Sequence, residues 1–161
     1  KRLLRDSKIL TAKQREEAYA WITAKCVYGV GAANHAEIDT LGIKPATQLA
    51  MQRALQQLNT TPELLRIDGC DGFSFDIPGE SHIRGDSRFA EIAAAGILAK
   101  VTRDRRMQEY AREFPGFGFD RHKGYGVKLH LELLAQRKYS EIHRLSFDPL
   151  RTMLVQGHLL P

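Results

Sequence analysis

Two aspartates stand at positions where a protein can hold a divalent metal ion. Asp68 ends a short apolar run, Leu64 to Ile67, and Asp86 lies between Gly85 and Ser87, 18 residues further on. Carboxylates that lie side by side repel each other unless one is protonated or a cation bridges them, and Mg²⁺ and Mn²⁺ take oxygen ligands. The pair therefore suggests a catalytic metal site. Spacing alone, however, favours a simpler interpretation, in which each aspartate stabilises a turn or caps a helix.

Basic side chains gather on both sides of Asp86 and further along the second half of the chain. They are Arg84, Arg88, Lys100, Arg103, Arg105, Arg106, Arg121, His122 and Lys123. Acids set among bases suit phosphodiester chemistry, because a metal ion engages the reacting phosphate while Lys and Arg hold neighbouring phosphates. For residues 103–106, which lie in a helical stretch, salt bridging or solvation is the more common outcome.

The segment from Gly116 to Gly126 (GFGFDRHKGYG) interleaves aromatic, glycine and basic residues. Such a loop can present a ring for stacking on a sugar or base, with cations beside it. We expect Phe117 and Phe119 to fill the core instead, and Tyr125, which is flanked by two glycines, to have a functional role.

Composition limits the class of protein. With 161 residues, 43% of them hydrophobic, the chain is long enough for one globular domain. The net charge of +5 comes wholly from residues 81–161, which suggests a polyanionic partner. No apolar run is long enough to span a membrane. Cys26 and Cys70 stand alone, which fits a reducing, cytoplasmic location, and we expect both to be small core residues.

Helices alternate with strands along the sequence. Thr11 with Gln14 forms a capping box before a helical pattern, and Asn34 with Glu37 repeats it. The patterns predict helices over residues 12–25, 35–41, 45–58, 89–114 and 127–138, and strands over residues 26–33, 64–67 and 81–84. This alternation predicts an α/β architecture. Three strands are few for so many helices, so we expect further strands upstream of Lys1.

Six short motifs, taken together and in order, resemble the type 2 ribonuclease H family, also called ribonuclease HII. They are Asp6-Ser7-Lys8, Ile67-Asp68-Gly69, Gly85-Asp86-Ser87, Ala99 to Arg105, His122 to Gly126 and His143 to Phe147. The resemblance implies a ribonuclease H-like mixed sheet flanked by helices. It extends to about residue 149, so we expect a catalytic domain over residues 1–149, and we expect a helical tail over residues 150–161.

The family resemblance carries an expected activity. Its members cut the RNA strand of RNA/DNA hybrids, and cut 5′ of ribonucleotides embedded in duplex DNA, leaving 3′-hydroxyl and 5′-phosphate ends. They use four carboxylates and two divalent ions, Mg²⁺ or Mn²⁺. We therefore expect RNA/DNA hybrids and ribonucleotide-containing duplexes as partners, no membrane association, and a cytoplasmic monomer.

The motifs also assign roles to residues. Asp68 and Asp86 match the third and fourth family carboxylates, and so are expected to be the catalytic metal ligands. Tyr125 matches a tyrosine that packs on the sugar at the RNA-to-DNA junction. Further substrate contacts are implied for Ser7, Lys8 and Lys123, and structural or secondary roles for Asp104 and Arg144.

The sequence departs from the family pattern at its start. The family's first strand carries an Asp-Glu pair and then Gly-Arg-Gly, which reads the ribose 2′-hydroxyl, and neither motif occurs in the 161 residues. Two carboxylates cannot hold two Mg²⁺ ions in place. We therefore expect the chain to lack its N-terminal strands, and to be inactive and poorly stable alone. The alternatives are a catalytically inactive nucleic-acid-binding remnant of the same fold and a plain interaction domain.

Overall fold

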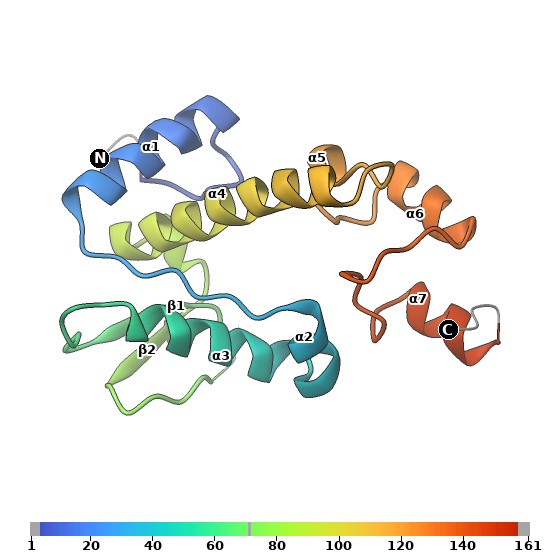
Figure 1. Ribbon diagram of the computed structural model, residues 1–161. Helices are drawn as coiled ribbons and strands as arrows, with labels where there is room; N and C mark the ends of the chain where they lie inside the picture. Colours follow the sequence, from blue (N-terminus) through green and yellow to red (C-terminus); the bar gives the residue numbers. More distant parts are fainter. Residues whose placement is uncertain (1–3, 71, 158–161) are drawn as a thin grey trace. The chain divides into compact units, whose positions relative to one another are not determined.

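The computed structural model describes residues 4–70 and 72–157, and Figure 1 shows their helices and strands. The elements in chain order are α1 (Ala12–Lys25), α2 (His35–Leu41), α3 (Ile43–Gln56), β1 (Leu65–Asp68), β2 (Gly79–His82), the 3₁₀ turn η1 (Gly85–Ser87), α4 (Ala90–Glu113), α5 (Phe119–His122), α6 (Lys128–Ala135) and α7 (Leu150–Val155). A helix-rich fold with a small parallel sheet confirms the predicted α/β class.

The chain forms two compact units. The first unit is built from the chain up to Ala32 and from Thr47 to Thr102, and the second from Ala33 to Ala46 and from Arg103 onward. Each is described by itself below. Helix α7 begins at Leu150, where the predicted tail starts.

Both predicted capping boxes are present and fix the starts of their helices. The Thr11 hydroxyl accepts from the N–H of Gln14 at 3.2 Å, and the Gln14 side chain accepts from the N–H of Thr11 at 2.9 Å. Asn34 and Glu37 exchange the same two bonds at the start of α2. These bonds satisfy amide groups that have no partner within a helix, so helices 12–25 and 35–41 are confirmed at their predicted starts.

Strands β1 and β2 are parallel neighbours in the first unit. Ile67 pairs with Ser81, and Asp68 pairs with His82 at the carboxyl end of both strands. The second strand ends two residues earlier than expected, because Arg84 adopts a left-handed conformation with φ of 55°. The predicted strand positions are thus confirmed to within a few residues.

The strand predicted over residues 26–33 is wrong, and a side chain explains why. The Gln57 amide accepts from the N–H of Val30 at 3.1 Å and donates to its carbonyl at 2.9 Å, as a neighbouring strand would. Gly31 lies so close to α3 that a Cβ there would come within 2.0 Å of the Ala50 carbonyl oxygen. The segment is therefore extended, but it pairs with Gln57 just beyond α3 and lies against α3 itself. Cys26 and Cys70 are exposed, so their predicted place in the core is also wrong.

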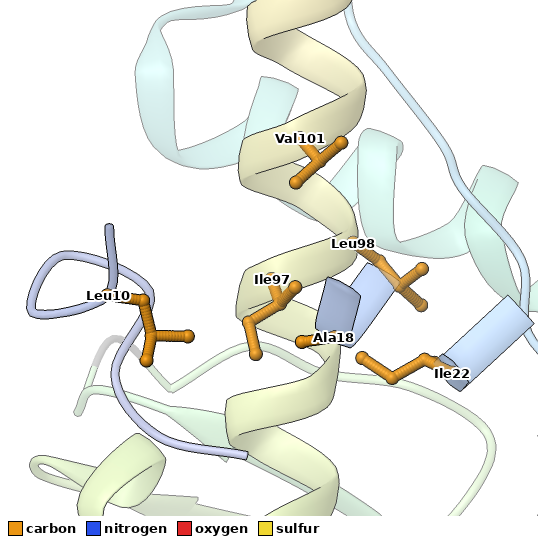
Figure 2. Close-up of a cluster of buried hydrophobic side chains, with 6 residues drawn as sticks. All are labelled: Leu10, Ala18, Ile22, Ile97, Leu98 and Val101. Carbon is orange, nitrogen blue, oxygen red and sulfur yellow. The ribbon is translucent and has the colours of Figure 1, made fainter. Parts of the chain in front are cut away.

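The core of the first unit lies between the N-terminal segment and helix α4. Its buried side chains are Leu10, Ala18, Ile22, Ile97, Leu98 and Val101, and Figure 2 shows Ala18 and Ile22 of α1 beside Ile97, Leu98 and Val101 of α4. Burial of these side chains is the main stabilising term for a contact of this kind. This packing fixes α4 against α1. It therefore also fixes the start of α4, which lies next to η1.

The second unit has a smaller aliphatic cluster and an aromatic one. Leu134 of α6 and Leu150 of α7 are buried together, with Tyr139 packed against them. Phe119 of α5 is 2% exposed, as predicted for a core residue. Within the residues that the structure describes, no helix is long and apolar enough to cross a bilayer.

Replacement of Ile97 tests the core of the first unit. Ile97 is fully buried, so Ile97→Ala should lower the free energy of unfolding by about 2–5 kcal/mol through lost contacts and a residual cavity. Ile9 is 66% exposed in the same unit, and Ile9→Ala should change it by less than about 0.5 kcal/mol. Guanidinium unfolding followed by circular dichroism measures both, and equal losses would contradict this core.

Candidate active site

The carboxylate of Asp68 lies against the turn that carries Asp86. Asp68 is the last residue of β1, and its Oδ1 accepts a hydrogen bond from the N–H of Gly85 at 2.8 Å. Gly85 immediately precedes Asp86 in η1. The structure therefore brings the end of β1 and the turn containing Asp86 into direct contact, at the carboxyl edge of the sheet.

The backbone at position 85 is closely packed. Gly85 is buried, and a Cβ there would lie 2.5 Å from Cδ1 of Ile92 and 3.4 Å from Oδ1 of Asp68. Its carbonyl accepts from the N–H of Phe89 at 2.8 Å, which leads η1 directly into α4. Asp86 is half-buried just before this long helix, where the positive end of the helix dipole favours a negative charge.

The donor chemistry at this edge fits a hard divalent cation. Asp68 is exposed and Asp86 is half-buried, and carboxylate oxygens are the ligands that Mg²⁺ and Mn²⁺ prefer. Across residues 4–70 and 72–157 there is no group of three or more His, Cys, Asp or Glu side chains placed to hold a metal ion.

Charged and aromatic contacts tie both strands to the start of α4. Arg66 of β1 forms ion pairs with Glu91 and, at 3.7 Å, with Glu80 of β2. The hydrogen bond to Glu91 raises the pKa of Arg66. The His82 ring packs against Phe89 at 4.4 Å between centroids. These contacts surround the backbone on which Asp68 and Asp86 are carried, and limit how far the two can separate.

Ser7 and Lys8 form a tight turn in the same unit as the two aspartates. The Asp6 carboxylate accepts from the N–H of Lys8 at 2.8 Å, and Arg15 donates to the Ser7 carbonyl at 3.0 Å. Leu10, two residues further on, is buried in the core. The turn is therefore anchored while the Lys8 side chain is exposed, as a phosphate-binding residue must be.

Lys123 and Tyr125 lie in the second unit, in the loop after α5. Lys123 and Gly124 both have positive φ, 50° and 78°, and the ammonium group of Lys123 donates to the Asp120 carbonyl at 2.6 Å. Tyr125 is 54% exposed, and the Arg103 guanidinium lies 5.1 Å from its ring centroid. The loop thus presents an aromatic ring with a cation beside it.

Asp104 and Arg144 also belong to the second unit. Asp104 is half-buried on α4. Arg144 is half-buried with its guanidinium 3.8 Å from the Phe147 ring centroid, and burial, assisted by the charge of Arg103, lowers its pKa. A desolvated cation of this kind favours an anionic neighbour.

Asp39 is a structural partner that the sequence did not reveal. Its carboxylate accepts from the N–H groups of Leu145 at 2.8 Å and Ser146 at 3.0 Å, more than a hundred residues away. Burial opposes its charge, but the bonds from Ser146 and Leu145 outweigh burial and lower its pKa. Asp39 thereby fixes the segment that follows Arg144. Nothing in its own sequence context points to so distant a partner.

Comparisons with known proteins identify the family. A family model described as Ribonuclease HII matches residues 1–149. A ribonuclease HII from Dehalococcoides mccartyi is 41% identical over 152 residues, which cover 94% of this chain and 72% of that protein. One from Bacillus licheniformis is 46% identical over 149 residues, which cover 92% of this chain and 58% of that protein.

A solved structure shares the fold. The crystal structure of the ribonuclease H2 from Pyrococcus horikoshii OT3 superposes with a TM-score of 0.72 at 21% identity, over 99% of this chain and 85% of that one. This likeness confirms the predicted ribonuclease H-like fold. Together with the family match over residues 1–149, it confirms the resemblance carried by the six motifs. The chain belongs to the ribonuclease HII family.

Proposed function

We propose that the function this chain serves is that of an endonuclease that hydrolyses the RNA strand of RNA/DNA hybrids and cuts 5′ of ribonucleotides embedded in duplex DNA, with Asp68 and Asp86 as two of its four carboxylates. The products have 3′-hydroxyl and 5′-phosphate ends. The observation that carries the proposal is the bond from the Gly85 N–H to the Asp68 carboxylate, which sets Asp68 beside the turn of Asp86, in a chain of the ribonuclease HII family.

Asp68 and Asp86 are the proposed catalytic residues and metal ligands. A bound Mg²⁺ or Mn²⁺ would supply a Lewis acid at the scissile phosphate and lower the pKa of a coordinated water. The protein's own contribution is to hold the two carboxylates at a fixed edge. The close packing at Gly85 and the Arg66 ion pairs serve that purpose.

Four residues are proposed to bind the nucleic acid. Lys8, presented by an anchored turn, and Lys123 place positive charge for phosphate contacts, and Ser7 supports the Lys8 turn. Tyr125 offers an exposed ring that can pack on a sugar, with Arg103 beside it. Phosphate contacts give affinity and register, whereas the ring contact adds stacking energy at the nucleotide it covers.

We further propose a cytoplasmic monomer whose catalytic domain spans residues 1–149. The exposed, unbridged thiols of Cys26 and Cys70 support a reducing compartment. Residues 150–161 form the proposed tail, which begins with helix α7.

A nucleic-acid-binding role without catalysis is the second candidate. It is favoured by one observation, that the 161 residues contain no adjacent Asp-Glu pair, whereas the family resemblance implies four carboxylates. The two candidates share the basic substrate contacts and differ only in cleavage.

Removal of either carboxylate charge tests the catalytic proposal. Asp68→Asn and Asp86→Asn should each lower the cleavage rate at least about 100-fold, since even indirect partners of a bound metal typically contribute 10–100-fold. The substrate is a duplex with a single ribonucleotide, in Mn²⁺, resolved on a denaturing gel. The parent is assayed both as residues 1–161 and with a family strand bearing Asp-Glu and Gly-Arg-Gly added at its N-terminus.

Asp76→Asn is the matched control, because Asp76 is an exposed aspartate in the same unit. We expect the extended form to cleave and the shorter one not to. Cleavage by both Asp68 and Asp86 variants at the parental rate would remove these residues from the site. Hybrid binding without cleavage by either parental form would favour the second candidate.

Replacement of Lys8 tests the phosphate contact. Lys8→Ala should weaken binding of an RNA/DNA hybrid and reduce the slope of log affinity against log salt by about 1, because one fewer phosphate contact is made. Fluorescence anisotropy at several salt concentrations measures both. Lys13→Ala removes an exposed charge at the start of α1, and should leave the slope closer to that of the parent. Hybrid affinity that is indifferent to salt would support a plain interaction domain.

Tyr125 is tested by separating its ring from its hydroxyl. Tyr125→Ala should weaken binding of a duplex with an RNA-to-DNA junction by about 1–3 kcal/mol, the usual effect of losing an aromatic stacking partner. Tyr125→Phe keeps the ring and should bind nearly as well as the parent. Anisotropy titrations measure both affinities. Parental affinity of the Ala variant would show that the ring makes no contact.

A further inference from the structure

Three histidines are buried together in the second unit. His122 of α5 is 5% exposed, His130 of α6 is 7% exposed, and His143, which precedes α7 in the chain, is 8% exposed. The ring of Phe119 contacts all three, at centroid distances of 5.7, 6.4 and 5.4 Å. Buried histidines need a hydrogen-bond partner for each ring nitrogen, and these partners set where their protons are.

A directional chain of hydrogen bonds runs through two of the rings. The N–H of Ser140 donates to Nδ1 of His143 at 2.9 Å, and Nε2 of His143 lies 3.2 Å from Nε2 of His130. Nδ1 of His130 lies 3.0 Å from the carbonyl oxygen of Tyr125. A backbone N–H only donates and a carbonyl only accepts. His143 therefore carries its proton on Nε2 and donates to His130, which donates from Nδ1 to Tyr125.

His122 holds the adjacent peptide group. Its Nδ1 accepts from the N–H of Gly124 at 3.1 Å, so its proton is on Nε2, which donates to the Phe117 carbonyl at 2.7 Å. The His122 and His130 rings are stacked, with centroids 4.2 Å apart and planes within 6°. The two stacked histidines thus bind one short segment at two points: His122 accepts from the N–H of Gly124, and His130 donates to the carbonyl of Tyr125.

We propose that His122, His130 and His143 are positioning residues, which hold the loop of Tyr125 through a chain of neutral rings with fixed tautomers. The arrangement of protons stands on the hydrogen bonds alone. Its consequence for substrate binding rests on the role of Tyr125 proposed above.

The electrostatics at His130 and His143 agree with neutral rings. Burial, followed by the neighbouring His130, lowers the pKa of His143 to about 4, and burial also lowers the pKa of His130. The titratable groups that act on His143 are His130 of α6, His122 of α5 and His35 of α2. All are bases whose protonation disfavours a further positive charge.

The sign of the pH effect follows from these lowered values. In the unfolded chain a histidine has a pKa of about 6.5. Below that pH the histidines of the unfolded state bind protons, whereas His130 and His143 of the folded state stay neutral to a lower pH. Stability contributed by the neutral rings is therefore complete above about 6.5 and falls as the pH drops towards about 4 for His143. A protonated His143 could no longer accept from Ser140, whose carbonyl lies 3.2 Å from Nδ1 instead.

The ring protons can be observed directly by long-range ¹H–¹⁵N NMR of the ¹⁵N-labelled chain of residues 1–161, without any substrate. We expect the Nδ1–H tautomer for His130, the Nε2–H tautomer for His122 and His143, and a titration midpoint for His143 at least one pH unit below that of a histidine in the denatured chain. A different tautomer at His130 or His143, or a midpoint for His143 like that of the denatured chain, would overturn the proposal.

Substitutions at His130 test the link to Tyr125. The amide nitrogen of an asparagine can take the place of Nδ1 and keep the donor to the Tyr125 carbonyl, so His130→Asn should retain most of the parental hybrid affinity. His130→Leu removes the donor and should weaken binding towards the level of Tyr125→Ala. In a Tyr125→Ala background His130→Leu should have no further effect, because the histidine acts only through the tyrosine.

Glu132→Gln, an exposed position on the same helix, is the control and should bind as the parent does. Additive effects of His130→Leu and Tyr125→Ala, or equal losses for the Asn and Leu variants, would overturn the positioning role. If the Leu variant does not fold, as judged by circular dichroism, the tautomers of the parental chain decide the proposal. Absence of hybrid binding by the parent would count against the proposed function, while the NMR result would still stand.

Discussion

One hydrogen bond, from the backbone of Gly85 to the carboxylate of Asp68, joins the two halves of the candidate active site. It uses an amide at the start of the α4 region and an acid at the end of β1. Such a charge-assisted bond is stronger than a neutral one, and the small residue at position 85 lets Ile92 and the Asp68 carboxylate pack closely around that backbone. The position of the carboxylates is therefore a property of the backbone, and follows from how β1 and α4 are held.

What holds them is ordinary apolar packing at a distance from the chemistry. Helix α4 is fixed by Ile97, Leu98 and Val101 against α1. Ile92, one turn before them, packs over Gly85. The same core buries Leu10, so the turn of Ser7 and Lys8 is held by it as well. Aliphatic burial in the first unit thus positions both the acids and one of the basic contacts.

Local signals were sufficient where the deciding interaction is local. Thr11 and Asn34 each cap a helix through a residue three positions on, so both starts could be read from the sequence. The placement of Asp68 and Asp86 was also predictable, since Asp68 ends one strand and Asp86 lies in the turn that follows the other. The strand expected over residues 26–33 failed because its backbone pairs with Gln57, 27 positions from Val30. Asp39 and Ser146 are 107 positions apart, and no periodicity or motif encodes such a contact.

The interiors of the two units differ in how their residues depend on one another. Leu10, Ile22 and Ile97 form a non-directional contact, in which another aliphatic side chain of similar volume fills the same space. His130 and His143 form a directional contact, in which each ring nitrogen has an assigned hydrogen-bond donor or acceptor as its partner. Among natural variants of this fold, the core positions of the first unit should exchange freely among Leu, Ile, Val and Met. Those of the second should change rarely and in concert, with substitutions at one ring accompanied by substitutions at its partners.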